Sequence, residues 1–133
     1  MLSQKAKKVM VKRGVSGLGL FAGEDIKKGD FVIKYTGKLI STKEADKLNT
    51  RYLFQIDDDY TIDGSGRDNI ARYINHFCKP NLEAQIEAGE IVFHALKDIK
   101  AGDELGFDYG REYFEEFIKP KGCACGSEKH LYA

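Results

Sequence analysis

Hydrophobic residues in this chain come in short runs, separated by turns rich in glycine and aspartate. Runs of this length that contain valine, isoleucine, phenylalanine and tyrosine are typical of β-strands, and glycine between them is typical of turns. The predicted strands are residues 9–11, 20–22, 31–35, 52–56, 60–62 and 91–93, with Ile86 beginning one more. The predicted turns are residues 16–19, 28–30, 57–59 and 88–89, and the last two indicate hairpins.

Two short helices are also predicted. Ser41 and Glu44 match a capping box, so a helix should begin there and run to about Leu48. Residues 112–118 form the second helix, which Pro120 should end. The apolar side chains of this second helix are Tyr113, Phe114, Phe117 and Ile118. They pack either on the core of the same chain, which is favoured, or on a second chain, so the oligomeric state stays open.

The composition indicates one soluble globular domain. The chain has 133 residues, of which 42% are hydrophobic and 32% are charged. Its 21 basic and 21 acidic residues cancel, which disfavours direct binding to nucleic acid. Basic residues near the start fit a solvated arm: Lys5, Lys7, Lys8, Lys12 and Arg13. No apolar run approaches the roughly 20 residues of a membrane span, and no secretory signal precedes the first strand. Three cysteines argue against a disulfide framework and for a reducing compartment.

One six-residue pattern occurs twice. Residues 25–30 read Asp-Ile-Lys-Lys-Gly-Asp, and residues 98–103 read Asp-Ile-Lys-Ala-Gly-Asp. A strand that ends near a tyrosine follows each copy, Tyr35 in the first case and Tyr109 in the second. Two interpretations stay open: both copies are common turns, or two similar strand units deliver two tyrosines to one place.

Residues 72–81 are the part of the chain richest in candidate chemistry. Asn75 and His76 follow an apolar stretch, so their polar groups should be held between buried walls. Buried amides and imidazoles need hydrogen-bond partners, which either the backbone or a polar ligand supplies. Gly17 and Gly19 lack a Cβ, so the backbone there can turn sharply or approach a ligand closely.

Three segments together resemble the SET-domain protein-lysine methyltransferases. Residues 16–22 resemble the first motif of the family, residues 72–81 its Arg-Phe-x-Asn-His-Ser-Cys-x-Pro-Asn motif, and residues 102–109 its Glu-Leu-Thr-Tyr-Asp-Tyr motif. The resemblance extends from about Val9 to Cys125. It implies a mainly β SET-domain fold, with several small β-sheets around a C-terminal pseudoknot and few short helices. It also implies an N-terminal arm (1–8), a SET domain (9–119) and a post-SET-like tail (120–133).

The resemblance implies S-adenosylmethionine as cofactor. The residues that fall on the family's cofactor-binding positions are Gly17, Leu18, Gly19, Arg72, Asn75, His76 and Tyr109. Phe77 stands where the family usually has serine, which places a large ring beside the cofactor instead of a hydroxyl.

The same resemblance assigns catalytic positions to Tyr109, Tyr35 and Phe107. The substrate lysine must be neutral to accept a methyl group, whereas a free lysine has a pKa of about 10.4. A narrow, dry channel lined by aromatic rings lowers that pKa and holds the alkyl stem. A tyrosine at position 107 would limit the number of methyl groups, so Phe107 predicts di- or trimethylation. Lys38 stands where the family's Tyr-x-Gly motif continues with glutamate.

The cysteines resemble a post-SET metal site. Cys123 and Cys125 match its first two cysteines, Cys78 matches the cysteine of the Asn-His motif, and His130 stands in the third post-SET position. Three thiolates and one imidazole form a legitimate tetrahedral zinc site. The alternative is a frayed, metal-free tail.

The resemblance therefore predicts a protein-lysine N-methyltransferase that acts on a lysine-containing protein, with a histone as the first candidate. We expect the peptide to add beside strand 52–56. The short chain looks similar to bacterial or viral members, so the protein is expected in the cytoplasm of a bacterium, or in the nucleus or on chromatin of a eukaryotic cell. The alternative is a non-catalytic SET-fold module that binds a peptide or the cofactor, which Phe77 and Lys38 favour and Tyr109 disfavours.

Overall fold

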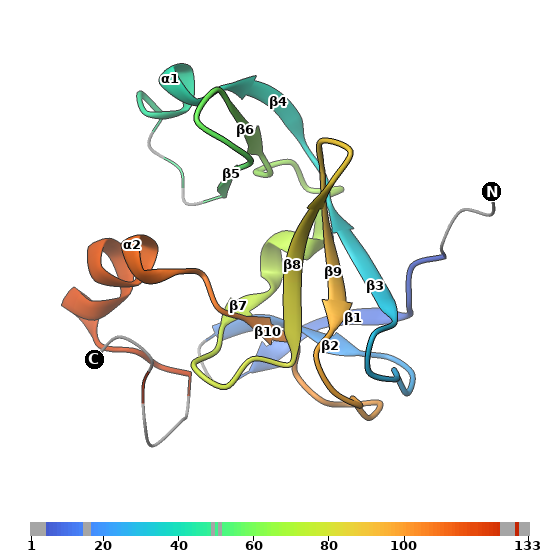
Figure 1. Cartoon of the computed structure of the whole chain (residues 1–133). Coiled ribbons are helices and arrows are strands. Elements are labelled where there is room, and N and C mark those ends of the chain that lie inside the picture. The colour runs from blue at the N-terminus through green and yellow to red at the C-terminus, as the bar shows by residue number, and fades with distance from the viewer. Residues whose placement is uncertain (1–4, 15–16, 49, 51, 126–129, 131–133) are drawn as a thin grey trace.

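The computed structural model describes the chain apart from residues 1–4, 15–16, 49, 51, 126–129 and 131–133 (Figure 1). Its strands are β1 (Val9–Gly14), β2 (Gly17–Ala22), β3 (Phe31–Tyr35), β4 (Lys38–Ser41), β5 (Leu53–Gln55), β6 (Tyr60–Asp63), β7 (Asn75–His76), β8 (Leu82–Glu87), β9 (Glu90–Ala95) and β10 (Gly106–Phe107). Its helical segments are α1 (Thr42–Ala45), a 3₁₀ turn (Ile70–Tyr73), α2 (Arg111–Tyr113), a π turn (Phe114–Ile118) and a 3₁₀ turn (Lys119–Lys121). The expected mainly β fold with few short helices is confirmed.

The described strands form four small sheets. β1 pairs with β2, β7 with β10, and the two three-stranded sheets have the orders β3-β9-β8 and β4-β6-β5. Figure 1 shows β4, β5, β6 and α1 as a lobe above the end of the β3-β9-β8 sheet. Both predicted hairpins are confirmed, because β5 pairs with β6 and β8 pairs with β9 in antiparallel register. Ala88 and Gly89 have φ angles of 51° and 77°, which suit the tight turn between β8 and β9.

Several expected boundaries differ in the structure. Gly17 and Gly19 belong to β2 and pair with β1, so the predicted turn at 16–19 is wrong for these residues, and Ser16 lies outside the described part. Ser41 caps α1 as expected by accepting a hydrogen bond from the Glu44 amide, but the helix ends at Ala45. Pro120 does not end the second helical run, because a 3₁₀ turn places it where its missing N–H is not needed. Phe114 is buried in the core, while the Phe117 side chain is outside the described part.

The two copies of the repeated pattern pair with each other through matching contacts in antiparallel orientation. Ile26 and Ile99 exchange two backbone hydrogen bonds of 2.8 and 2.7 Å. The Asp98 carboxylate accepts a hydrogen bond from the Lys28 amide, and the Asp25 carboxylate accepts one from the Ala101 amide, each at 2.9 Å. The two similar units are therefore in contact, which favours the second interpretation of the repeat.

The segment before Tyr109 is threaded between two earlier parts of the chain. On one side, the Leu105 amide donates to the Leu20 carbonyl at 2.8 Å. On the other side, the Asn81 side chain accepts from the Gly106 amide and donates to the Glu104 carbonyl, both at 2.9 Å. The buried Asn81 thus completes the backbone hydrogen bonds of an irregular segment that has little sheet of its own. This threading forms the expected pseudoknot and carries Tyr109 towards β7.

Candidate functional site

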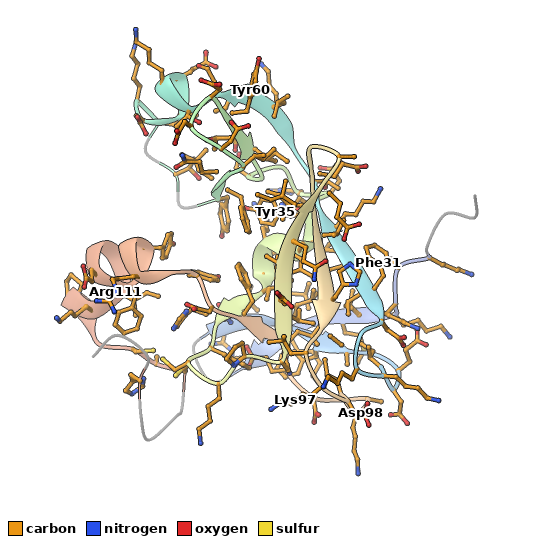
Figure 2. All side chains as sticks on the ribbon, in the orientation of Figure 1. Phe31, Tyr35, Tyr60, Lys97, Asp98 and Arg111 are labelled. Carbon is orange, nitrogen blue, oxygen red and sulfur yellow. The ribbon has the colours of Figure 1, made fainter. Side chains whose placement is uncertain are left out.

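A row of aromatic rings connects the two tyrosines of the repeat. Tyr35 packs on Phe54 at 5.3 Å between ring centroids, and Phe54 stacks on Phe107 at 5.9 Å. Phe107 contacts Tyr109 at 4.7 Å, and Tyr109 contacts Tyr113 at 4.9 Å. Figure 2 shows Tyr35 between the β4-β5-β6 lobe and the β3-β9-β8 sheet. The structure therefore brings Tyr35, Phe107 and Tyr109 together, and Phe54 and Tyr113 extend the row.

Tyr35 is held rigidly at one end of this row. Its hydroxyl donates a hydrogen bond to the Tyr52 carbonyl at 2.8 Å. Burial, together with the nearby Asp63 carboxylate, raises the pKa of Tyr35, so its hydroxyl stays protonated. The ring also needs Gly64, because a Cβ there would lie 2.3 Å from a Tyr35 ring carbon. Tyr35 thus forms a fixed wall of the row.

Tyr109 is bound at both its backbone and its side chain. Its amide donates to His76 Nδ1 at 3.1 Å. Its hydroxyl donates a hydrogen bond to the Ile74 carbonyl. Ile74 precedes Asn75 and His76 directly, so the polar end of Tyr109 lies against the segment that carries the amide and the imidazole.

Asn75 is oriented by two acceptors. Its Nδ2 donates to the Leu18 carbonyl at 3.0 Å and to Glu104 Oε2 at 3.1 Å. Both N–H groups of the amide are therefore engaged, and Oδ1 has no hydrogen-bond partner among the described residues. The Glu104 carboxylate fits here only because Gly14 and Gly19 lack a Cβ, which would lie 2.3 and 2.4 Å from its oxygens. Our sequence reasoning missed Glu104, although an acidic side chain inside the third motif was a signal.

Arg72 lies between two tyrosine rings. Its guanidinium carbon is 5.0 Å from the centroid of Tyr52 and 4.9 Å from that of Tyr73. Nη1 donates to the Ser65 carbonyl at 2.7 Å, and Nη2 donates to the Tyr73 hydroxyl at 3.0 Å. Nε is buried and has no hydrogen-bond partner among the described residues.

His76 is buried, with 7% of its surface exposed. Nδ1 accepts from the Tyr109 amide, and Nε2 lies 3.3 Å from Cys78 Sγ. Burial lowers the pKa of His76 more than the Asp108 carboxylate raises it, so the ring is neutral. Because both ring nitrogens have partners within the protein, a contact from His76 to a cofactor would use its ring face or its backbone.

Phe77 packs on the backbone of Gly106. A Cβ added to Gly106 would lie 2.2 Å from Cγ of the Phe77 ring. The ring therefore occupies the volume that a side chain at position 106 would fill. Phe77 takes this place because Gly106 stands where the family motif has threonine, so two departures from the family pattern lie in direct contact.

Cys78, Cys123, Cys125 and His130 form a cluster whose potential ligand atoms all lie within 4.8 Å of one another. Cys78 Sγ is 3.8 Å from Cys123 Sγ, and His130 Nδ1 is 3.2 Å from Cys78 Sγ and 3.6 Å from Cys125 Sγ. A tetrahedral zinc with Zn–S bonds of about 2.3 Å and Zn–N bonds of about 2.0 Å separates its ligands by comparable distances. Desolvation raises the pKa of the Cys123 thiol to about 12, so metal binding there must release a proton. The donor set and its spacing fit one zinc ion.

The chain matches the SET domain family over residues 17–110. Over 92% of its length it is 40% identical to a histone-lysine N-methyltransferase, H3 lysine-4 specific, of Schizosaccharomyces pombe. Over 85% of its length it is 38% identical to the histone-lysine N-methyltransferase EHMT1 of Mus musculus. It spans 15% of the first relative and 10% of the second. The chain therefore belongs to the SET domain family, as its three motifs predict.

Solved structures agree with this assignment. A chain in the crystal structure of the Chaetomium thermophilum polycomb repressive complex 2 superposes with a TM-score of 0.74 at 39% identity, over 80% of this chain and 16% of that chain. A chain of ctPRC2 in an autoinhibited conformation bound to S-adenosylmethionine has a TM-score of 0.71 at 38% identity, over 80% and 15%. Separately, no helix in the described part of the chain is long and apolar enough to cross a membrane.

Proposed function

We propose that this chain is an S-adenosylmethionine-dependent protein-lysine N-methyltransferase. The observation that carries the proposal is the position of Tyr109. Its ring lies in the aromatic row between Phe107 and Tyr113, and its hydroxyl and amide are tied to Ile74 and His76 on either side of Asn75. An aromatic channel and a polar cofactor site thus meet at one residue. The names of its relatives, which are histone-lysine N-methyltransferases, support the same activity.

The residues present fit the cofactor. When bound, S-adenosylmethionine supplies a methyl group on a positively charged sulfur. Asn75 presents Oδ1 as an acceptor for an ammonium group. A Cβ built at Gly17 meets no atom of the described residues within 4 Å, so the β2 backbone is open to a ligand at Gly17, whereas the Glu104 carboxylate fills the space at Gly19. The similar ctPRC2 chain that is bound to S-adenosylmethionine supports the choice of this cofactor.

The aromatic row suits a lysine side chain. The rings of Tyr35, Phe54, Phe107 and Tyr109 exclude water and pack on an alkyl stem. Exclusion of water disfavours the ammonium form, so the amine loses its proton to solvent and enters neutral. The Tyr109 hydroxyl and the Ile74 carbonyl then orient the nitrogen lone pair for an in-line displacement.

The proposed substrate is a lysine-containing protein, with a histone as the first candidate. β5 is an edge strand in the order β4-β6-β5, so one side of its backbone is open to pairing with an extended peptide. Phe54 lies on β5, which brings a peptide added there next to the aromatic row. A histone is preferred because the relatives' names specify histone lysines.

The proposed second cofactor is one structural zinc ion at Cys78, Cys123, Cys125 and His130. These ligands would join the tail, residues 120–133, to the segment that follows His76. A tail fixed in this way would help to enclose the site.

Methyl transfer is tested by mass spectrometry of core histones and of a basic non-histone protein after incubation with the chain and S-adenosylmethionine. We expect the masses of lysine-containing histone peptides to rise in steps of about 14 Da, one step for each methyl group. A non-catalytic binding module, which is the second candidate, would bind the cofactor in calorimetry without changing any substrate mass. That outcome would reject the proposed activity while leaving the cofactor site in place.

Phe107→Tyr is expected to restrict the product to monomethyl-lysine. Phe107 is 8% exposed and packs between Phe54 and Tyr109, so a hydroxyl added to its ring occupies space that a second methyl group needs. The wild-type chain should instead accumulate di- and trimethyl-lysine under excess cofactor, as mass spectrometry of the product will measure.

The matched control is Phe31→Tyr. Phe31 begins β3, lies outside the aromatic row and borders an open hollow of about 250 Å³ that Ala6 and Ile70 also line, so the product distribution should not change. A wild-type chain that stops at monomethyl-lysine would contradict the role proposed for Phe107.

A further inference from the structure

The His76 imidazole lies between the two sites described above. Its Nδ1 is 3.1 Å from the Tyr109 amide nitrogen, in the proposed active site. Its Nε2 is 3.3 Å from Cys78 Sγ, in the proposed zinc site. The ring also packs on Tyr109 at 5.6 Å and on the buried Phe114 at 5.3 Å, so it has little freedom to rotate. One side chain therefore touches both sites.

The partners of the ring select one tautomer. A backbone amide can only donate, so Nδ1 must carry the lone pair and accept this hydrogen bond. In a neutral imidazole the proton then sits on Nε2, which points at Cys78 Sγ. A thiolate accepts such a hydrogen bond more strongly than a thiol does. Metal binding to Cys78 thus strengthens the hydrogen bond that holds the ring against Tyr109.

We propose that His76 is a positioning residue that couples metal binding at the Cys78 cluster to the backbone of Tyr109. The proposal rests on the proposed function and on the proposed zinc site. A metal ligand whose hydrogen-bond partner is lost typically binds its metal about 10- to 100-fold more weakly. Linkage makes this coupling reciprocal: if an ordered Tyr109 backbone raises the affinity for the metal by some factor, metal binding favours the ordered backbone by the same factor.

Two substitutions separate the two hydrogen bonds. In His76→Asn, the shorter amide can replace Nδ1 as acceptor for the Tyr109 N–H but cannot reach Cys78. In His76→Gln, the longer amide can replace Nε2 as donor to Cys78 but leaves the Tyr109 N–H without its acceptor. The first readout is Zn²⁺ affinity, measured by competition with a chromophoric chelator. The second is hydrogen exchange of the Tyr109 amide, measured by NMR with and without Zn²⁺.

In the wild-type chain, removing Zn²⁺ should speed exchange of the Tyr109 amide about three-fold, because linkage makes this factor equal to the Zn²⁺ affinity lost when the Tyr109 contact is broken. His76→Asn should bind Zn²⁺ about 10- to 100-fold more weakly. His76→Gln should keep its affinity within about three-fold, while its Tyr109 amide exchanges fast whether or not Zn²⁺ is bound. His94→Asn is the matched control, because this imidazole pairs with Glu87 at 3.2 Å on the surface, and should change neither readout.

The proposal is overturned if the wild-type chain binds no stoichiometric Zn²⁺, if Zn²⁺ leaves Tyr109 exchange unchanged, or if His76→Asn binds Zn²⁺ as tightly as the wild type. The exchange comparison on the wild-type chain needs no substitution, so it decides even where a variant does not fold. Neither readout involves methyl transfer. A chain without methyltransferase activity therefore tests the coupling separately from the proposed function.

Discussion

Tyr109→Phe is expected to lower kcat for methyl transfer about 100- to 1,000-fold, the range seen when one preorganised hydrogen-bonding group is removed from an active site. The Tyr109 hydroxyl is held by the Ile74 carbonyl, so its position does not depend on solvent. Phenylalanine keeps the ring contacts with Phe107, Tyr113 and His76, and the fold should be preserved. The loss should therefore fall on kcat and leave the dissociation constant of the cofactor within about three-fold.

Single-turnover methylation of a lysine peptide measures the rate, and calorimetry measures cofactor affinity. Tyr60→Phe is the matched control, because it removes the same hydroxyl from a ring that is 50% exposed and lies outside the aromatic row. Its rate should equal that of the wild type. A Tyr109→Phe variant that retains more than a tenth of the wild-type rate would remove Tyr109 from the role proposed here.

Patterns in the sequence predicted those parts of the fold that depend on residues close together in the chain. The strands at 31–35, 52–56 and 60–62 carry alternating or continuous apolar residues, and the structure places β3, β5 and β6 there. The helix cap at Ser41 is also confirmed, because its hydrogen bond from the Glu44 amide needs only residues three apart. The boundary of α1 was less predictable, since only Ala45 of this short helix is buried and packing does not extend it.

Such patterns could not predict how residues 104–107 are threaded between earlier parts of the chain. Its hydrogen bonds reach Leu20 and Asn81, which are distant in sequence, so no local periodicity encodes it. The family motifs supplied the pseudoknot and the convergence of Tyr35 and Tyr109. They did not supply Glu104, Phe54 or Tyr113, because the partners of these side chains depend on which face each strand presents after threading.

Phe77 and Gly106 should prove strongly coupled in stability. Gly106→Thr alone forces a Cβ to within 2.2 Å of the Phe77 ring, and overpacking of this kind costs about 3 kcal/mol of the free energy of unfolding. Phe77→Ser alone removes a half-buried ring and costs about 2 kcal/mol. In the double variant, the threonine side chain enters the space that the ring has left. Its total cost should therefore be about 2 kcal/mol, well below the sum of the two single costs.

Urea unfolding followed by circular dichroism measures all four corners of this cycle. Phe77→Ser combined with Ile40→Val is the control for additivity. Ile40 lies on β4 in the β4-β6-β5 lobe, whereas Phe77 follows β7 in another part of the fold, so the two costs should add to within about 0.5 kcal/mol. If the costs of Phe77→Ser and Gly106→Thr simply add, the two departures from the family pattern are unrelated. If the two costs couple as expected, the Phe77 ring compensates for the side chain that is missing at position 106. A large ring next to His76 is then compatible with an intact cofactor site, and the strongest sequence argument for a non-catalytic module loses its basis.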